Sequence, residues 1–314
     1  MGFQVAFSNV LLTLLFIVPG FIICKCKKVA AEHLSTMSAV LIYVCSPCMI
    51  VNSFLQLEFS WGGFGNMALF CAVTLVLQIA FMLILYLIFR KKYADSKYRI
   101  LTIGAVLGNV GFFGLPIVKA ILPDNPEVMC YSSVYVFSMN ILVFTMGVFC
   151  LTNDKKYMTF KSALLNPSTF SILVALPLYF FGVKQYLPDL LLGGISLLGN
   201  MTTPLCMIIL GIRLATVSFK KLFTRPIIYL TCACKLILFP LFCYLAVYFI
   251  PFEFSFKASI LILSAVPCAS VILNMAEIHH SETELAANCV LLTTLLCFIT
   301  IIVGDWISAQ MPGK

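Results

Sequence analysis

Charged residues are scarce in this chain. They make up 10% of its 314 residues, whereas hydrophobic residues make up 62%; ordinary soluble domains contain about 25% charged and about 45–50% apolar residues. A water-soluble fold could not bury so large an apolar surface. The composition predicts a membrane protein, and it argues against a nucleic-acid-binding domain because the 20 Lys and Arg residues stand in short clusters between apolar runs.

Patterns typical of catalysis or metal binding are also missing. The chain has three histidines, and its 14 cysteines show no zinc-ligand spacing. An intramembrane enzyme would need a nucleophile with its base or a metal cluster, but no HExxH or GxSxG motif is present. We expect no enzymatic activity, no metal and no cofactor. A coupling ion, H⁺ or Na⁺, is left open.

The apolar residues fall into ten runs, each close to the roughly 20 residues that a helix needs to cross a bilayer. The runs cover residues 5–24, 34–56, 64–89, 99–122, 128–151, 164–183, 189–214, 226–250, 257–277 and 285–308. We therefore predict an all-α polytopic membrane protein with ten transmembrane helices.

Basic residues mark one side of these spans. Fifteen of the 20 Lys and Arg residues lie in the first, third, fifth and seventh connections, and short loops rich in Lys and Arg stay in the cytoplasm. The pattern predicts a multi-pass protein of the cell membrane with both termini on the outer side. The ninth connection, 277–284, is acidic although this scheme places it inside, and its role is left open.

Two halves of the chain match at an offset of 157 residues. The string SPCMI at 46–50 faces TPLCM at 203–207. Five spans per half is an odd number, so the second half must enter the membrane from the opposite side. The sequence thus predicts two inverted five-helix repeats, 1–157 and 158–314, an arrangement typical of secondary transporters.

The fourth and ninth runs contain residues that interrupt a helix. The fourth has GNVGFFGLP at 108–116 and the ninth has SAVPCAS at 264–270; Gly costs about 1 kcal/mol and Pro about 3 kcal/mol in a helix interior. A helix that restarts inside the membrane presents free N–H groups and a positive dipole end to an anion. The paired breaks therefore indicate a binding site, and the alternative is that both prolines only kink helices that neighbouring helices repair.

Four strings resemble the auxin efflux carrier family in its bacterial branch, whose members include malate and malonate permeases. They are GNVGFFGLPIV at 108–118, TPLCMIILGIRLA at 203–215, KLILFP at 235–240 and AVPCASVILNMAE at 265–277. The resemblance covers nearly the whole chain and preserves the order of the motifs. It implies a fold similar to the bile-acid symporters, in which helices 1, 2, 6 and 7 form a scaffold and helices 3–5 and 8–10 form a moving transport domain.

The resemblance also implies the substrate site. Helices 4 and 9 would be broken and cross at Pro116 and Pro267, and Asn109 of the pattern Asn-x-Gly-x-x-Gly-x-Pro would contact the substrate. The substrate-binding residues implied in this way are Asn109, Val110, Gly111, Gly114, Pro116, Pro267, Cys268, Ser270 and Asn274. The ninth helix departs from the family pattern, because Cys268, Ser270 and a later Asn274 replace an Asn soon after the proline. A homodimer through the scaffold is implied as well.

One charged residue lies deep inside a predicted span. Lys235 stands about ten residues into the eighth run, and a charge at the bilayer centre costs about 2.5–3.5 kcal/mol on insertion scales. We interpret it as polar support of the transport domain, with Gln78 or Asn140 as candidate neighbours. The alternative is a side chain that extends to the lipid headgroups.

These features predict a secondary transporter of small organic anions, mono- or dicarboxylates such as malate, that works by an elevator-like motion. The alternatives are a channel or uniporter for another small solute, and a sodium-coupled carrier of larger organic acids. The expected partners are the organic anion and the lipid bilayer, and no nucleic acid. The sequence does not decide the substrate, the direction of transport, the coupling ion or the oligomeric state.

Overall fold

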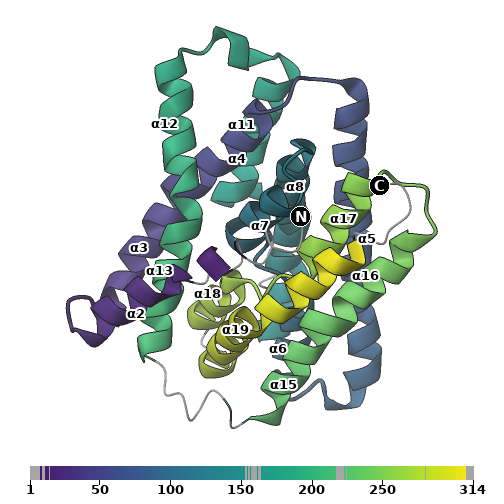
Figure 1. Ribbon diagram of the computed structural model, residues 1–314. Helices are drawn as coiled ribbons and strands as arrows, with labels where there is room; N and C mark the ends of the chain where they lie inside the picture. Colours follow the sequence, from purple (N-terminus) through teal and green to yellow (C-terminus); the bar gives the residue numbers. More distant parts are fainter. Residues whose placement is uncertain are drawn as a thin grey trace.

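The computed structural model describes residues 8, 11–13, 15–152, 154, 156, 161, 164–216, 223, 225–279 and 281–308. Most of these residues are helical, and the described part of the chain has no β-strand beyond a single bridge between Gly108 and Cys268 (Figure 1). The first residues of the first predicted span and the predicted repeat boundary at 157/158 lie outside the described residues, as do Lys155, Lys220 and Lys221 of the basic connections.

The α-helices are α2 (Ile17–Lys25), α3 (Leu34–Val40), α4 (Ser46–Leu55), α5 (Trp61–Phe89), α6 (Ser96–Val106), α7 (Leu115–Ile121), α8 (Glu127–Leu142), α9 (Val148–Thr152), α11 (Pro167–Phe180), α12 (Asp189–Asn200), α13 (Thr202–Thr216), α15 (Pro226–Ala233), α16 (Phe239–Tyr248), α17 (Phe254–Ser264), α18 (Ser270–Ile278) and α19 (Thr283–Ser308). Four π-helical segments join some of them, namely η2 (Leu41–Cys45), η4 (Val110–Gly114), η5 (Val143–Gly147) and η8 (Cys234–Leu238). The 3₁₀ turns are η1 (Ala31–His33), η3 (Arg90–Lys92) and η7 (Val183–Tyr186).

Five continuous helices are long and apolar enough to cross a membrane: Leu34–Leu55, Trp61–Lys92, Glu127–Thr152, Asp189–Thr216 and Pro226–Tyr248. Shorter apolar helices cover Leu11–Lys25, Val110–Ile121, Pro167–Phe180, Phe254–Ser264 and Thr283–Cys297. Large apolar side chains also face outward, with Leu190 90% exposed and Phe249 85% exposed. An outer surface of this kind belongs in lipid, because soluble proteins rarely expose large apolar patches.

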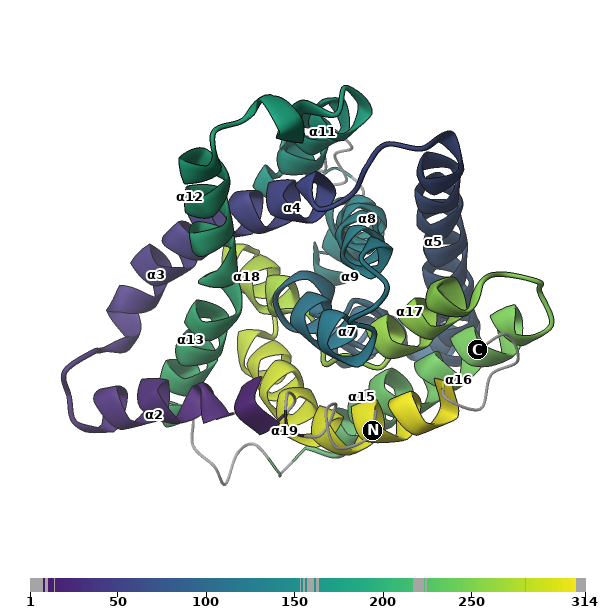
Figure 2. The same ribbon diagram turned by 45° about the horizontal axis from the view of Figure 1, so that its top comes forward.

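The helices form two groups that face each other (Figures 1 and 2). The first helix group contains α2, α3, α4, α11, α12 and α13; α2 packs along α13, and α4 contacts both α11 and α12. The second helix group contains the remaining α-helices, in which α5 packs on α8, α15 on α6 and α16 on α17. In both views α7, α8 and α18 lie between the outermost helices of the two groups.

Two glycines allow α2 and α13 to touch through their backbones. A Cβ atom on Gly20 would overlap the carbonyl oxygen of Ile208, and a Cβ atom on Gly211 would overlap that of Ile17. Small residues permit this close approach in membrane helix pairs, where van der Waals packing replaces the hydrophobic effect. The contact holds α2 firmly against α13.

Three of the π-helical segments end just before a proline at the start of the next α-helix. Pro47 is the second residue of α4, which follows η2. In the same way, Pro116 is the second residue of α7 after η4, and Pro240 is the second residue of α16 after η8. Proline has no N–H group and its ring collides with the carbonyl four residues earlier, so a wider turn accommodates it without ending the helix. These prolines therefore shape continuous helices.

The acidic ninth connection lies against basic residues from the seventh. Glu277 pairs with Arg213 at 3.1 Å, and Arg225 pairs with Glu282 at 3.4 Å and with Glu284 at 4.0 Å. The charge pattern placed this acidic connection at the end of the molecule that is rich in Lys and Arg. The ion pairs explain why carboxylates occur there, because they neutralise arginines at the same end.

Candidate functional site

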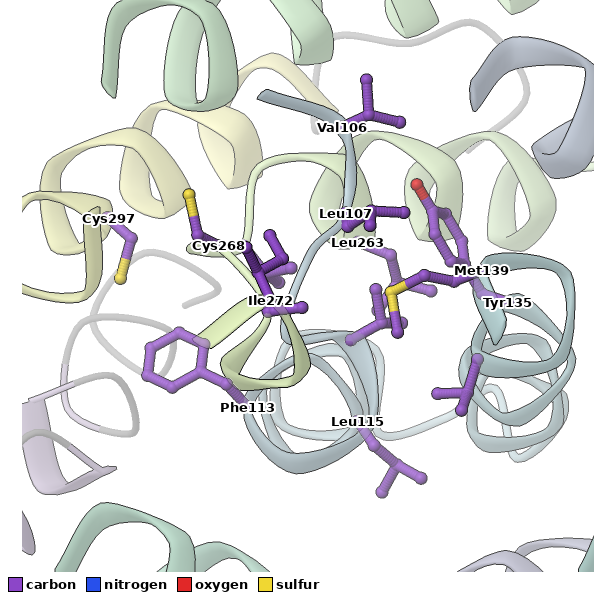
Figure 3. Packing of buried hydrophobic residues seen from close by; sticks show 14 of the residues in the cluster. Val106, Leu107, Phe113, Leu115, Tyr135, Met139, Leu263, Cys268, Ile272 and Cys297 are labelled. Carbon is purple, nitrogen blue, oxygen red and sulfur yellow. The ribbon is translucent and has the colours of Figure 1, made fainter. Parts of the chain in front are cut away.

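The fourth and ninth predicted spans are both interrupted, as the sequence predicts, and the two interruptions cross. The N–H of Asn109 donates to the carbonyl of Pro267 at 2.8 Å, and the N–H of Ala269 donates to the carbonyl of Leu107 at 2.9 Å. Each extended segment thereby satisfies the backbone groups of the other, which lipid could not do. Figure 3 shows Leu107 and Leu263 on one side of this crossing and Cys268 on the other.

The predicted crossing at Pro116 is wrong. The helix ends at Val106 and resumes at Val110, so the crossing lies at Gly108, eight residues before Pro116. A Cβ on Gly108 would come within 2.8 Å of Val266 Cγ2 and 3.0 Å of Lys235 Nζ. The close approach of these two side chains requires glycine at the crossing. Pro267 does lie there, since its carbonyl accepts the Asn109 hydrogen bond.

Two helices begin at the crossing and direct unpaired polar groups into one space. Among the described residues, no backbone acceptor is present for the N–H groups of Gly111, Phe112, Ser270 and Val271, which form the first turns of η4 and α18. The Asn109 Nδ2 and Ser270 Oγ atoms are also buried without a hydrogen-bond partner in the described structure. Helix N-termini with such groups attract anions, because the free N–H groups and the helix dipole both favour negative charge.

A cavity of about 100 Å³, here called the central cavity, adjoins both helix starts. Its polar lining residues are Ser46, Asn109, Asn140, Asn166, Ser168, Ser270 and Asn274, and no charged side chain of the described residues lines it. The first helix group contributes Ser46, Asn166 and Ser168, and the second contributes the others. A ligand in the central cavity would therefore touch both groups.

Weak polar contacts connect the two groups at the wall of the central cavity. Asn140 Nδ2 donates to Asn166 Oδ1 at 3.5 Å, and Thr203 Oγ1 of α13 donates to the carbonyl of Phe112 at 3.2 Å. Neither contact is short for its type. The groups are thus held together here by bonds that a relative displacement could break at small cost.

Lys235 lies next to the crossing, at the C-terminal ends of α6 and α17. Its ammonium donates to the carbonyl of Val106, the last residue of α6, at 3.2 Å and to the carbonyl of Ser264, the last residue of α17, at 3.0 Å. The side chain is fully buried. Because helix C-termini carry partial negative charge, one ammonium here stabilises both half-helices.

The predicted neighbours of Lys235 occupy other places. Gln78 donates to the carbonyl of Thr74 and to Ser138 Oγ, and Asn140 lines the central cavity. Of the predicted binding residues, Asn109, Val110, Gly111, Ser270 and Asn274 line that cavity. The lining of the central cavity does not include Gly114, Pro116, Pro267 or Cys268.

Sequence reasoning missed the part of the cavity wall that the first helix group supplies. Ser46 stands in the string that revealed the internal repeat, so a signal for it existed. Asn166 and Ser168 begin α11, where Asn166 Oδ1 accepts the N–H of Ser168 as an N-terminal cap. Nothing in the local sequence distinguishes this cap from an ordinary one, so its position in the cavity could not be foreseen.

Two further cavities lead from the central cavity toward one end of the molecule. A narrow space of about 30 Å³, here called the neck, shares Ile42, Phe112, Ser270 and Asn274 with the central cavity. The neck in turn adjoins a cavity of about 890 Å³, here called the vestibule, next to the acidic ninth connection. Asn274 lines all three spaces, so they lie next to one another.

A separate cavity of about 250 Å³, here called the outer cavity, lies toward the opposite end. Pro116, Lys119 and Asn200 are among its lining residues, and Met49 is the residue that it shares with the central cavity. Within the described residues, no group of three or more His, Cys, Asp or Glu side chains could hold a metal ion.

Comparison with known proteins identifies the family. A family model described as membrane transport protein matches residues 5–304. An uncharacterized transporter of Methanocaldococcus jannaschii is 25% identical over 313 residues, covering 95% of this chain and 97% of the relative. An uncharacterized transporter of Methanothermobacter thermautotrophicus is 23% identical over 308 residues, covering 96% and 98% of the two chains.

These matches indicate a transporter and not an enzyme, as the sequence predicts. They support the resemblance to the auxin efflux carriers at the level of the family. The apolar helices, the crossed helix breaks and the match over nearly the whole length lead to one conclusion: the chain belongs to the membrane transport protein family.

Proposed function

We propose that this protein is a secondary transporter of small organic anions, such as the mono- and dicarboxylates exemplified by malate. Its ten predicted spans form two inverted repeats, 1–157 and 158–314. The first helix group is the scaffold and the second is the transport domain, which moves against the scaffold in an elevator-like manner. The location of the central cavity between the two groups supports this assignment.

The helix starts at the crossing are the observation that favours an anion. Four N–H groups without a backbone acceptor and the Asn109 amide belong to residues that line the central cavity, and no described side chain of negative charge lines it. A carboxylate would accept hydrogen bonds from these donors and gain from two helix dipoles. The volume of about 100 Å³ favours a small carboxylate over a larger organic acid.

The cavities favour a carrier over a channel. The central cavity shares four lining residues with the neck, which in turn borders the vestibule, whereas the outer cavity shares only Met49 with it among the described lining residues. A binding site with access to one end at a time is what alternating access requires. Because the vestibule lies at the end that bears the basic connections, this conformation opens toward the cytoplasm.

The test is thermal stabilisation of the detergent-purified protein by a panel of carboxylates, amino acids, bile acids and indole acids. A ligand that binds only the folded state stabilises it by about 2.7 kcal/mol at 100 times its dissociation constant. We expect L-malate or a related small carboxylate to raise the melting temperature, and Asn109→Ala to abolish this rise.

Asn125→Ala is the matched control. Asn125 precedes α8 and donates to Glu127, the first residue of that helix, and it does not line the central cavity. Its loss should therefore leave the response to carboxylates unchanged. The proposal fails if no organic anion stabilises the parent protein while a cation or neutral solute does. It also fails if Asn109→Ala and Asn125→Ala respond to carboxylates alike.

A further inference from the structure

One basic side chain lies on the path between the central cavity and the vestibule. Arg213, near the end of α13, lines both the neck and the vestibule, and it is the one charged residue among those described that lines the neck. The vestibule is otherwise acidic, with Glu32, Glu277 and Glu284 in its lining. An anion that leaves the central cavity along this path must pass the Arg213 guanidinium.

The guanidinium already holds a carboxylate. Arg213 Nη1 donates to Glu277 Oε1 at 3.1 Å, and Nη2 lies 3.5 Å from Asn274 Oδ1. Both partners belong to α18, whereas Arg213 belongs to α13 of the first helix group. Ser270, Asn274 and Glu277 follow one another at helical spacing along α18, so they form a polar track from the helix start at the central cavity to Arg213.

We propose that Arg213 is a second anion-binding residue, at which a carboxylate of the substrate replaces the carboxylate of Glu277. This inference rests on the proposed function, since it requires an organic anion as the transported solute. It adds an anion-binding position in the neck, separate from the one at the helix crossing.

The surroundings of the pair make such an exchange favourable. The Arg213 side chain is 17% exposed and that of Glu277 is 47% exposed, and an ion pair with a solvated partner contributes little to stability. Arginine binds carboxylates through parallel N–H groups, so a free carboxylate can form the same bonds as Glu277. Glu284 competes less for the Arg213 guanidinium, because Arg225 lies within 4.0 Å of the Glu284 carboxylate.

The exchange predicts opposite effects for the two members of the pair. Arg213→Gln removes the guanidinium and should weaken the binding of L-malate about 10- to 100-fold, the loss expected for one hydrogen bond to a charged group. Glu277→Gln removes the competing carboxylate and should tighten malate binding. A purely structural ion pair would not produce a gain, because either substitution would then only damage the site.

The experiment determines the dissociation constant of L-malate from the concentration dependence of thermal stabilisation. It compares the full-length parent protein with Arg213→Gln and Glu277→Gln. Glu282→Gln is the matched control, because it removes the carboxylate of an ion pair of 3.4 Å at the same end of the molecule and Glu282 lines none of the three cavities. This control variant keeps Arg225 beside Glu284 and should bind malate within about twofold of the parent.

The inference is overturned if Arg213→Gln binds malate as the parent does, or if Glu277→Gln weakens binding as Arg213→Gln does. Should Arg213→Gln fail to fold, Glu277→Gln alone decides, since unchanged or weaker binding contradicts the exchange. If Asn109→Ala loses malate binding while neither Arg213→Gln nor Glu277→Gln changes it, the proposed function stands and only the anion-binding role of Arg213 is refuted. If the parent binds none of the panel carboxylates, the proposed function fails and this inference fails with it.

Discussion

Replacing Lys235 tests whether one ammonium stabilises both broken spans. The Lys235→Met variant keeps a flexible side chain of similar length but removes the donor that serves the carbonyls of Val106 and Ser264. Both carbonyls belong to fully buried residues at the ends of helices, so each then becomes a buried acceptor that has lost its Lys235 donor.

The expected loss of stability follows from these two bonds. A buried polar group left unpaired costs about 1–3 kcal/mol, which gives about 2–6 kcal/mol for two carbonyls. Methionine avoids the several kcal/mol that burial of an ammonium costs, so part of this loss is offset. We expect a net destabilisation toward the lower end of this range, about 2 kcal/mol, or roughly 4 °C in melting temperature for a chain of this size.

The assay is the melting temperature of the detergent-purified protein, measured by size-exclusion chromatography after heating. Lys257→Met is the matched control, because Lys257 is 5% exposed and donates to one carbonyl, that of Tyr248, at 3.3 Å. Its melting temperature should fall by less. A Lys235→Met variant that melts at the parent temperature, or a larger effect from Lys257→Met, would refute the reasoning.

The position of the ammonium also predicts independence from sodium. A cation bound at the crossing would have to occupy the space between the two helix C-termini, which Lys235 Nζ already fills. Replacing NaCl with choline chloride should therefore leave the melting temperature and carboxylate uptake of the parent unchanged. Stabilisation of the parent by Na⁺ alone would contradict this explanation.

Two further predictions concern packing and orientation. Gly211→Ala should lower the melting temperature, because the new Cβ would overlap the backbone of α2. Gly193→Ala is the control and should not lower it, because no atom lies within 4 Å of a Cβ there. Equal melting temperatures of the two variants would argue against the close contact of α2 with α13. Cys26 is exposed beside Lys25 and Lys27, so a membrane-impermeant maleimide should label it in inside-out vesicles and not in intact spheroplasts, with Cys26→Ser as the control. Labelling of Cys26 from outside would reverse the predicted orientation.

The sequence predicted the two helix breaks but misplaced one of them. Glycine and proline between apolar residues identified the interrupted spans, since both disfavour a helix interior. The position of the first break depends instead on contacts of Gly108 with Val266 and Lys235, which come from distant parts of the chain. Pro116 was an unreliable marker, because the π-helical turn η4 before it accommodates the proline inside the continuous helix Val110–Ile121.

Partners of charged residues were the least predictable feature. Lys235 was expected to meet a polar side chain, yet it binds backbone carbonyls, and every residue possesses a carbonyl. The acidic ninth connection conflicted with the charge pattern until the structure placed its carboxylates beside Arg213 and Arg225. Such pairings depend on how separate helices assemble, and a pattern read along one chain does not contain that information.

The crossing has a consequence for how the protein is made. The carbonyl of Leu107 and the N–H of Asn109 bond to residues 267–269, which the ribosome adds only after about half the chain has been synthesised in between. Until then the fourth span holds unpaired backbone groups, each of which costs several kcal/mol in lipid. The nascent first half must therefore keep this segment hydrated or covered by other helices, and the fourth span reaches its final form only when the ninth arrives.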